Sequence, residues 1–179
     1  GDVLKNTAFD QLYDEHVFTF SATSVKNAFA KHKLELIDIE HQEVHGGSMR
    51  FFLAHRGQYP VRPAVTQLIQ NEHRHGLHLQ ETYDKFRSRA EKIRKTLVAQ
   101  ITTLNSNGQL VVGYGATAKS STVLNYCELG SNNIAWIQDS TSEKQGKLTP
   151  GTHIPIVSPE VFQESSPDFA VLFAWNHQI

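Results

Sequence analysis

The residue types best suited to acid–base chemistry stand near the start of the chain, in Tyr13-Asp14-Glu15-His16. A histidine flanked by carboxylates has its imidazolium form stabilised and its tautomer fixed, which suits a general base that works near neutral pH. Tyr13 is placed to donate a hydrogen bond to a developing oxyanion. By spacing alone the segment is more typical of a polar loop between two elements, so chemistry here is one of two interpretations.

A glycine-rich turn forms the second candidate site. The apolar residues 110–112 predict a buried strand, and Gly113-x-Gly115-x-x-Ala118 follows it and opens a helix. Free backbone N–H groups and the helix dipole favour an anion at such a turn, and Asp139 ends the next strand, where an acidic ribose ligand would stand. The alternative is that any α/β unit needs a tight turn at this point.

Lys119 adds charge to this turn. A cation in the first turn of a helix opposes the helix dipole, so we expect an anion or an acidic side chain to compensate it. The stretch also resembles a P-loop, but it lacks the glycine that precedes the lysine of that motif, which argues against an NTPase.

Composition excludes several classes of protein. The net charge of −1 provides no field that would recruit nucleic acid or an anionic membrane. The single cysteine excludes a disulfide framework and fits a reducing compartment, and no apolar run approaches the length of a membrane span. The ten histidines show no zinc spacing. We expect a cytoplasmic soluble protein of 179 residues without a metal site.

The elements before residue 108 predict a helix, a hairpin and more helices. Ser21 is a plausible N-cap for a helix to about Lys33, and two strands, 34–40 and 49–54, flank a Gly-Gly turn and predict an antiparallel pair. Glu35, Ile37 and Ile39 would share one face of the first strand. Two helices follow, and the longer one ends near Asn105 with one continuous apolar stripe, residues 79, 83, 86, 90, 93, 97, 101 and 104.

From residue 109 the pattern changes to strands that alternate with helices. Strands at 110–113, 134–138, 154–157 and 169–175 predict a parallel sheet with right-handed crossovers. The chain stops where another helix would begin, so we expect an excised piece of a longer protein. The fold class is therefore α/β, a Rossmann-like three-layer domain with a parallel sheet.

Several segments together resemble one family, the S-adenosylmethionine (SAM)-dependent C-methyltransferases of nucleotide-activated keto-deoxysugars. The resembling segments run nearly the whole length of the chain in order: 9–16 (FDQLYDEH), 44–50 (VHGGSMR), 113–119 (GYGATAK), 124–127 (LNYC), 139–147 (DSTSEKQGK), 148–155 (LTPGTHIP) and 174–176 (AWN).

The resemblance implies three parts. Residues 1–57 would be the tail of a truncated SAM-methyltransferase domain, with its terminal helix and β-hairpin. Residues 58–108 would be a helical connector, and residues 109–179 the C-terminal Rossmann-like domain. The family's zinc-binding segment and SAM glycine loop would lie upstream of Gly1, so SAM and zinc would be bound outside this chain, and the fragment alone would be inactive.

The resemblance also implies roles for residues. His16 would be the base that removes a proton alpha to the sugar ketone, with Tyr13 and Glu15 orienting it and stabilising the enolate. The turn of His45, Gly46 and Gly47 would stand beside that site. Lys119, with the turn at Gly113 and Gly115, would face the nucleotide diphosphate or a neighbouring carboxylate, and Asp139 and Lys147 are further candidates for the same ligand.

The expected partner is therefore a nucleotide-diphosphate sugar, with no nucleic acid and no membrane, and a homo-oligomer is left open. The alternative function is a regulatory or scaffold Rossmann module that binds NAD or another nucleotide through Gly113, Gly115 and Asp139 without catalysis. The sugar, the methylated carbon and the nucleobase are not specified by the sequence.

Overall fold

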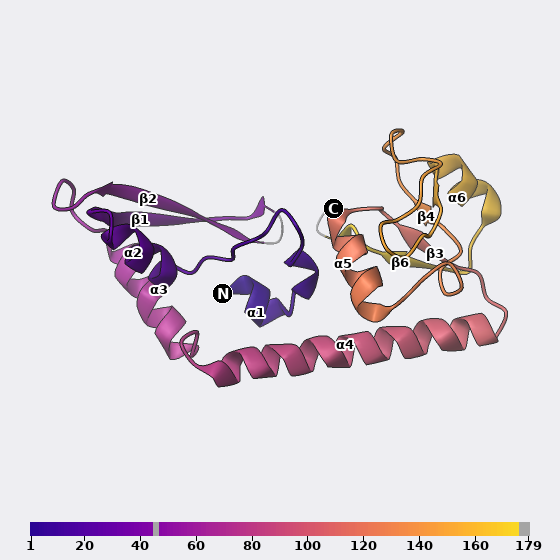
Figure 1. Ribbon diagram of the computed structural model, residues 1–179, viewed down its shortest axis with the longest axis horizontal. Helices are drawn as coiled ribbons and strands as arrows, with labels where there is room; N and C mark the ends of the chain where they lie inside the picture. The colour runs from indigo at the N-terminus through magenta and orange to yellow at the C-terminus, as the bar shows by residue number, and fades with distance from the viewer. Residues whose placement is uncertain (45–46, 176–179) are drawn as a thin grey trace. The chain divides into compact units, whose positions relative to one another are not determined.

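The computed structural model describes residues 1–44 and 47–175. The chain divides into two compact units, each formed by two segments (Figure 1). The first unit is Gly1–Ala8 with Phe18–Ser88, and the second is Phe9–Val17 with Arg89–Ile179. The expected boundaries after residues 57 and 108 concern domains of a longer parent protein, and they stay a prediction.

The first unit is built on an antiparallel hairpin. Strands β1 (Leu34–Gln42) and β2 (Ser48–His55) pair with each other, as the sequence predicted. Helices α2 (Ala22–Ala30) and α3 (Pro63–Arg74) pack on the hairpin (Figure 1), and a short helix α1 (Asp2–Asn6) precedes them. Ser21 caps α2 as expected, because its hydroxyl accepts the Ser24 N–H.

The prediction of which residues share a face of the first strand is wrong. The pairing of β1 with β2 shifts register between Leu36 and Asp38, so Ile37 is an extra residue in the ladder. A bulge of this kind moves the following side chains to the other face. Leu36 and Ile39 are therefore both buried, although the sequence placed them on opposite faces.

One buried carboxylate joins two helices of this unit. Glu72 of α3 accepts hydrogen bonds at the N-terminus of α2, from the Ala22 N–H at 2.6 Å and from the Thr23 N–H at 2.9 Å. The Thr23 hydroxyl donates to the same carboxylate. Negative charge is favourable at a helix N-terminus, so Glu72 fastens α2 to α3 over the core.

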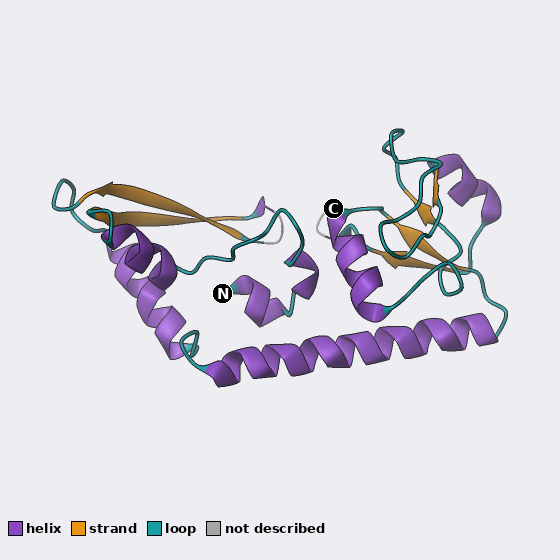
Figure 2. Cartoon of the chain, in the orientation of Figure 1, coloured by secondary structure: helices purple, strands orange, loops and turns teal. Residues whose placement is uncertain are grey.

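The second unit contains a parallel sheet in the order β5-β4-β3-β6, which confirms the α/β class. Its elements are β3 (Val111–Tyr114), α5 (Ala118–Cys127), β4 (Ile137–Gln138), β5 (Ile156–Val157), α6 (Pro159–Ser165) and β6 (Phe169–Leu172). Figure 2 shows these short strands in orange among the helices of the unit. β4, β5 and β6 are shorter than the sequence predicted, whereas β3 has the predicted length and begins one residue later.

Helices pack against both faces of this sheet. The main core joins α5 and the end of α4 (Gln80–Ser106) to one face, with Leu124, Ile101 and Ile137 among its most buried residues. On the other face, the rings of Tyr114 and Trp136 contact Phe162 of α6 edge-on. This arrangement is consistent with the Rossmann-like layers that the sequence predicted.

The apolar stripe of the long helix is not buried along its whole length. Ala90 and Ile101 are buried, whereas Leu79, Tyr83 and Ile93 are more than two-fifths exposed. Only the C-terminal part of α4 packs on the sheet core, through Leu97, Val98, Ile101 and Leu104. Periodicity shows which side of a helix is apolar, but the length of the partner surface decides how much of that side is covered.

Candidate active site

The segment that carries Tyr13, Glu15 and His16 is part of the second unit, together with the parallel sheet. It begins with the 3₁₀ helix η1 (Phe9–Gln11), which packs on α5. The Phe9 ring lies 5.1 Å from the Tyr126 ring, and the Thr122 hydroxyl donates to the Leu12 carbonyl at 3.4 Å. Contacts from α5 therefore hold the segment immediately before the candidate base.

His16 has a defined tautomer. Its Nδ1 lies 2.7 Å from the Gln11 carbonyl oxygen. A carbonyl oxygen only accepts hydrogen bonds, so Nδ1 carries the hydrogen, and in the neutral ring Nε2 holds the free lone pair. The side chain is exposed to solvent. His16 is therefore both accessible and oriented in the manner of a general base. The orienting acceptor, Gln11, was not among the residues that the sequence analysis singled out.

Tyr13 lies beside this imidazole. The centroids of the Tyr13 and His16 rings are 4.2 Å apart, with an angle of 31° between the planes. Burial raises the pKa of the Tyr13 phenol, and the negative charges of Glu15 and Asp10 raise it further. The phenol therefore keeps its proton at neutral pH and can donate a hydrogen bond. In the structure, Glu15 thus acts on Tyr13 electrostatically.

A buried cluster that the sequence analysis did not predict lies next to this segment. The Asp10 carboxylate accepts the Trp175 indole N–H at 2.7 Å, and the Lys119 ammonium lies 5.4 Å from the centre of the Trp175 ring. Asp10 and Lys119 are both more than nine-tenths buried. Burial lowers the pKa of Lys119, and the Asp10 carboxylate opposes that decrease. The acidic compensation expected for Lys119 is therefore supplied by Asp10.

The two glycines of the turn are required by packing. A Cβ at Gly113 would lie 2.7 Å from Ile137 and 3.0 Å from Phe173. Gly115 has a φ of +90°, and a Cβ there would lie 2.9 Å from the Ala174 Cβ. Thr117 then caps α5 by accepting the Ser120 N–H. Packing and backbone conformation are thus sufficient to explain why glycine stands at both positions. Nucleotide binding by these residues stays a prediction.

Asp139 already has protein partners. Its carboxylate accepts the Ala116 N–H at 2.8 Å and the Thr141 N–H at 2.9 Å, and the Lys144 ammonium lies at 3.2 Å. Burial alone would raise the pKa of Asp139, but the bonds from Thr141 and Lys144 lower it overall. Asp139 therefore ties the glycine turn to the loop after β4. Lys144, which the sequence analysis did not select, also donates to the Ala116 carbonyl.

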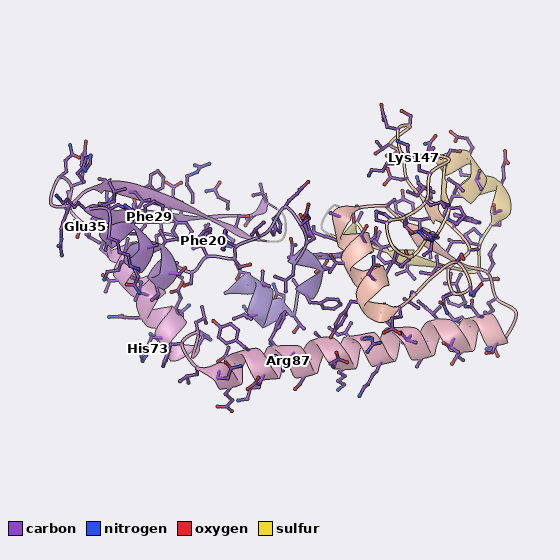
Figure 3. The ribbon with its side chains drawn as sticks, in the orientation of Figure 1. Phe20, Phe29, Glu35, His73, Arg87 and Lys147 are labelled. Atoms are coloured by element: carbon purple, nitrogen blue, oxygen red, sulfur yellow. The ribbon has the colours of Figure 1, made fainter. Side chains whose placement is uncertain are left out.

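The other expected ligands of the sugar nucleotide are less constrained. Lys147 is exposed on the loop between β4 and β5 (Figure 3). His45 and Gly46 lie outside the described residues. Gly47 belongs to the first unit, has a φ of +115°, and a Cβ there would lie 2.8 Å from Asp2 Oδ2. The structure thus groups Tyr13, His16 and Lys119 on one unit through Asp10.

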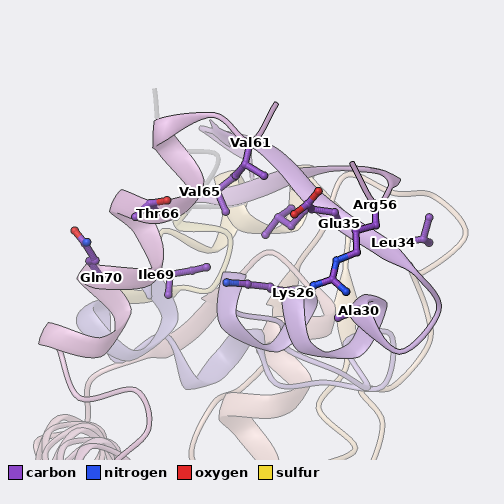
Figure 4. Close-up of a pocket in the computed structure, with 11 residues that line it drawn as sticks. Lys26, Ala30, Leu34, Glu35, Arg56, Val61, Val65, Thr66, Ile69 and Gln70 are labelled. Carbon is purple, nitrogen blue, oxygen red and sulfur yellow. The ribbon is translucent and has the colours of Figure 1, made fainter. Parts of the chain in front are cut away.

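A pocket of about 210 Å³ lies in the first unit, between α2, α3 and the hairpin (Figure 4). Its lining combines the cations Lys26 and Arg56 with Glu35 and an apolar wall that includes Val65 and Ile69. None of the candidate catalytic or ligand-binding residues chosen from the sequence lines it. Within residues 1–44 and 47–175, no group of three or more histidine, cysteine, aspartate or glutamate side chains could hold a metal ion.

No helix in the described part of the chain combines the length and the apolar character needed to cross a membrane.

Comparison with known proteins identifies the family. The model of the C-methyltransferase C-terminal domain matches residues 43–179. The chain is also 38% identical over 177 residues to the C-methyltransferase NovU of Streptomyces niveus. That alignment covers 98% of this chain and 42% of NovU, so the chain spans less than half the length of this curated relative. The resemblance inferred from the motifs is thereby confirmed: this chain belongs to the C-methyltransferase family and contains its C-terminal domain.

Proposed function

We propose that this chain is part of a SAM-dependent C-methyltransferase that acts on a nucleotide-linked keto-deoxysugar, and that it supplies the enolising base, His16. The observation that carries the proposal is the bond between His16 Nδ1 and the Gln11 carbonyl, because it leaves Nε2 as the unprotonated nitrogen of an exposed ring. The family and the relative's name support methyl transfer to carbon.

The residues of this chain account for the proton-transfer half of the reaction. His16 Nε2 takes the proton from the carbon alpha to the sugar ketone, and the electron pair of that C–H bond moves onto the carbonyl oxygen as an enolate. The protonated Tyr13 phenol donates a hydrogen bond to that oxygen. General-base catalysis of this type contributes about 10²- to 10⁴-fold in rate. When bound, SAM would supply the methyl group that the enolate carbon accepts.

The resemblance also suggests which part of the parent protein binds each ligand. We propose that the SAM pocket and the zinc segment are contributed by sequence upstream of Gly1, and that the isolated chain does not complete methyl transfer. The sugar nucleotide would meet this chain at the Tyr13–His16 segment. Lys119 is assigned to a carboxylate of the protein rather than to the diphosphate, because the charge of Asp10 already favours its protonated form.

The enolisation step can be tested in this chain without SAM. In deuterated water, a functional base exchanges the α-proton of a thymidine or uridine diphosphate keto-deoxysugar, and mass spectrometry measures the gain of one mass unit. We expect exchange above the buffer rate with the wild-type chain, and a decrease of roughly 10²-fold or more with His16→Asn. Tyr13→Phe should lower the rate less.

His32→Asn is the matched control, since His32 is an exposed histidine of the first unit. It should exchange at the wild-type rate. Exchange that is unchanged in His16→Asn, or absent from the wild-type chain, would overturn the proposal. Calorimetry with SAM sharpens it, because measurable SAM affinity in this chain would contradict the proposed upstream position of the methyl-donor pocket.

The alternative, a module that binds NAD without catalysis, receives less support. Its acidic ribose ligand would be Asp139, whose carboxylate is already engaged by Ala116, Thr141 and Lys144. A titration of NAD against the diphosphate sugar separates the two functions, and a preference for NAD would favour the module.

A further inference from the structure

The parallel sheet has a point at which the direction of strand order reverses. From the central strand β3 the chain first builds β4 and β5 on one side, and it then returns to add β6 on the other side. In open α/β sheets, ligands bind outside the carboxyl ends of the strands at such a point. Here the carboxyl end of β3 leads through Gly115 to Lys119 on α5, and the chain after β6 leads to Trp175.

The group that meets Lys119 and Trp175 is a side chain of the protein itself. Asp10, which is far away in the sequence, accepts the Trp175 indole N–H at 2.7 Å and faces the Lys119 ammonium electrostatically. Only 8% of Asp10 and 6% of Lys119 are exposed, so neither charged group is well solvated by water. A charge of opposite sign nearby is therefore favourable for each, because an uncompensated buried charge is strongly unfavourable.

Lys119 lies in the first turn of α5, where a cation is unfavourable by itself. In nucleotide-binding domains, a phosphate supplies the negative charge at the equivalent helix N-terminus. In this chain, the charge of Asp10 acts on Lys119 through space. The carboxylate that accepts an N–H of the turn itself, that of Ala116, is Asp139.

Asp10 is directly connected to the candidate base. The next residue, Gln11, provides the carbonyl that accepts His16 Nδ1–H. Tyr13 lies three residues further on, and its pKa responds to the charge of Asp10. A displacement of Asp10 therefore displaces the acceptor that fixes the His16 tautomer.

We propose that Asp10 is a positioning residue, which fastens the base-bearing segment to the sheet domain through its hydrogen bond from Trp175, beside the buried Lys119 ammonium that lies over the Trp175 ring. This inference rests on the proposed function of His16. It deepens that function by naming the side chain that holds the base-bearing segment against the sheet domain.

The experiment uses the full chain labelled with ¹⁵N. The indole N–H signals of Trp136 and Trp175 are separate probes, and the ring nitrogen shifts of His16 report its tautomer. The variants are Asp10→Ala, which removes the acceptor and the charge, and Asp10→Asn, which keeps an acceptor for Trp175 but removes the charge. Glu164→Gln, an exposed carboxylate of α6, is the control.

In Asp10→Ala we expect the Trp175 N–H signal to move and lose its protection from solvent exchange, while Trp136 stays unchanged. His16 should lose its preference for the Nδ1–H tautomer. The maximal rate of α-proton exchange should fall roughly tenfold or more, with the half-saturating sugar concentration changed less than about threefold. Asp10→Asn should keep the Trp175 signal. Its maximal exchange rate should lie between those of Asp10→Ala and the wild type.

Wild-type Trp175 and His16 signals in a folded Asp10→Ala would overturn the inference, and so would a wild-type exchange rate in that variant while His16→Asn is inactive. If Asp10→Ala does not fold, Asp10→Asn decides by the same tautomer readout. A wild-type exchange rate in His16→Asn would instead overturn the proposed function. The ring nitrogen shifts of His16 would still show whether Asp10 determines the tautomer of that imidazole.

Discussion

Each unit of this protein contains a buried acidic residue that joins two segments, but the partners of the two carboxylates differ. Glu72 in the first unit is satisfied mainly by backbone N–H groups at the start of α2. Asp10 in the second unit accepts a side-chain hydrogen bond from the Trp175 indole, and its charge acts on the Lys119 ammonium through space. Backbone partners exist for any sequence that forms the helix, whereas the side-chain partners require three specific residues.

This difference separates two tasks. Glu72 fixes how two helices pack, so its removal should cost stability and leave the chemistry of the second unit unchanged. Asp10 fixes where the base-bearing segment lies, so its removal should change the behaviour of His16 more than the stability of the sheet.

The largest effect is expected from Glu72→Ala. It leaves the Ala22 N–H without its acceptor at a buried helix start, and we expect a loss of about 2 to 3 kcal/mol in the free energy of unfolding of the first unit. Both tryptophans lie in the second unit. Urea unfolding followed by circular dichroism should therefore shift, while the transition followed by tryptophan fluorescence should not.

Glu72→Gln keeps one acceptor oxygen and should cost about 1 kcal/mol. Glu81→Ala, at an exposed position of α4, is the control. A parallel shift of the fluorescence transition in Glu72→Ala would show that the two units unfold together, and it would remove the basis for comparing them.

A smaller effect is expected from the pair Asp10 and Trp175. A double-mutant cycle with Asp10→Ala and Trp175→Phe should give a coupling free energy of about 1 to 2 kcal/mol, because the indole N–H donates to a charged acceptor. The measurement is urea unfolding followed by the fluorescence of Trp136. Strictly additive effects would show that the bond contributes nothing to holding the segment.

The acid dependence of the second unit should be smaller still. The folded-state pKa of Asp139 lies below its ordinary value, so its stabilisation is fully present above the unfolded-state pKa of about 3.9. It is lost as the pH falls through the lower folded-state value. We expect Asp139→Asn to flatten the acid limb of the stability curve below about pH 4. Fluorescence-monitored melting between pH 2 and pH 7 gives that curve, and an unchanged limb would contradict the assignment.

The smallest effects concern two ion pairs on α4. Lys85 pairs with Glu81 at 2.7 Å on an exposed face, and Lys85→Ala should cost about 0.3 kcal/mol at low salt. Arg94 pairs with Glu128 at 2.8 Å and lies over the Tyr126 ring, so Arg94→Ala should cost about 1 kcal/mol. Urea unfolding in low and high salt distinguishes the two pairs. Equal losses of unfolding free energy in the two variants would show that the Arg94 pair gains nothing from its contact with the Tyr126 ring.

Local sequence patterns predicted most of the elements. The Ser21 cap, the hairpin strands and the alternation of strands and helices after residue 109 were all read from spacing and turn residues, and the structure contains them. The patterns failed where a long-range partner decides the outcome. The bulge at Ile37 depends on pairing with β2, and the exposure of Leu79 and Tyr83 depends on where the sheet core ends.

The candidate site shows the same limit. The residue types in Tyr13-Asp14-Glu15-His16 were sufficient to suggest a base, and the position of Lys119 on its helix was sufficient to require a negative partner. Neither pattern could identify Asp10 as that partner, because the two residues are more than a hundred positions apart. The acceptor of His16, the Gln11 carbonyl, is a backbone group and has no signature in side-chain types.

By itself, the sequence determined the α/β class, the family, and the chemical groups available for catalysis, because these depend on residue types and short-range spacing. Only the tertiary structure decided which unit carries the base-bearing segment, which carbonyl fixes the imidazole, and which carboxylate acts electrostatically on the buried lysine. The physical reason is that buried charges and hydrogen-bonding groups must find partners through space, and the chain that supplies a partner need not be near in sequence.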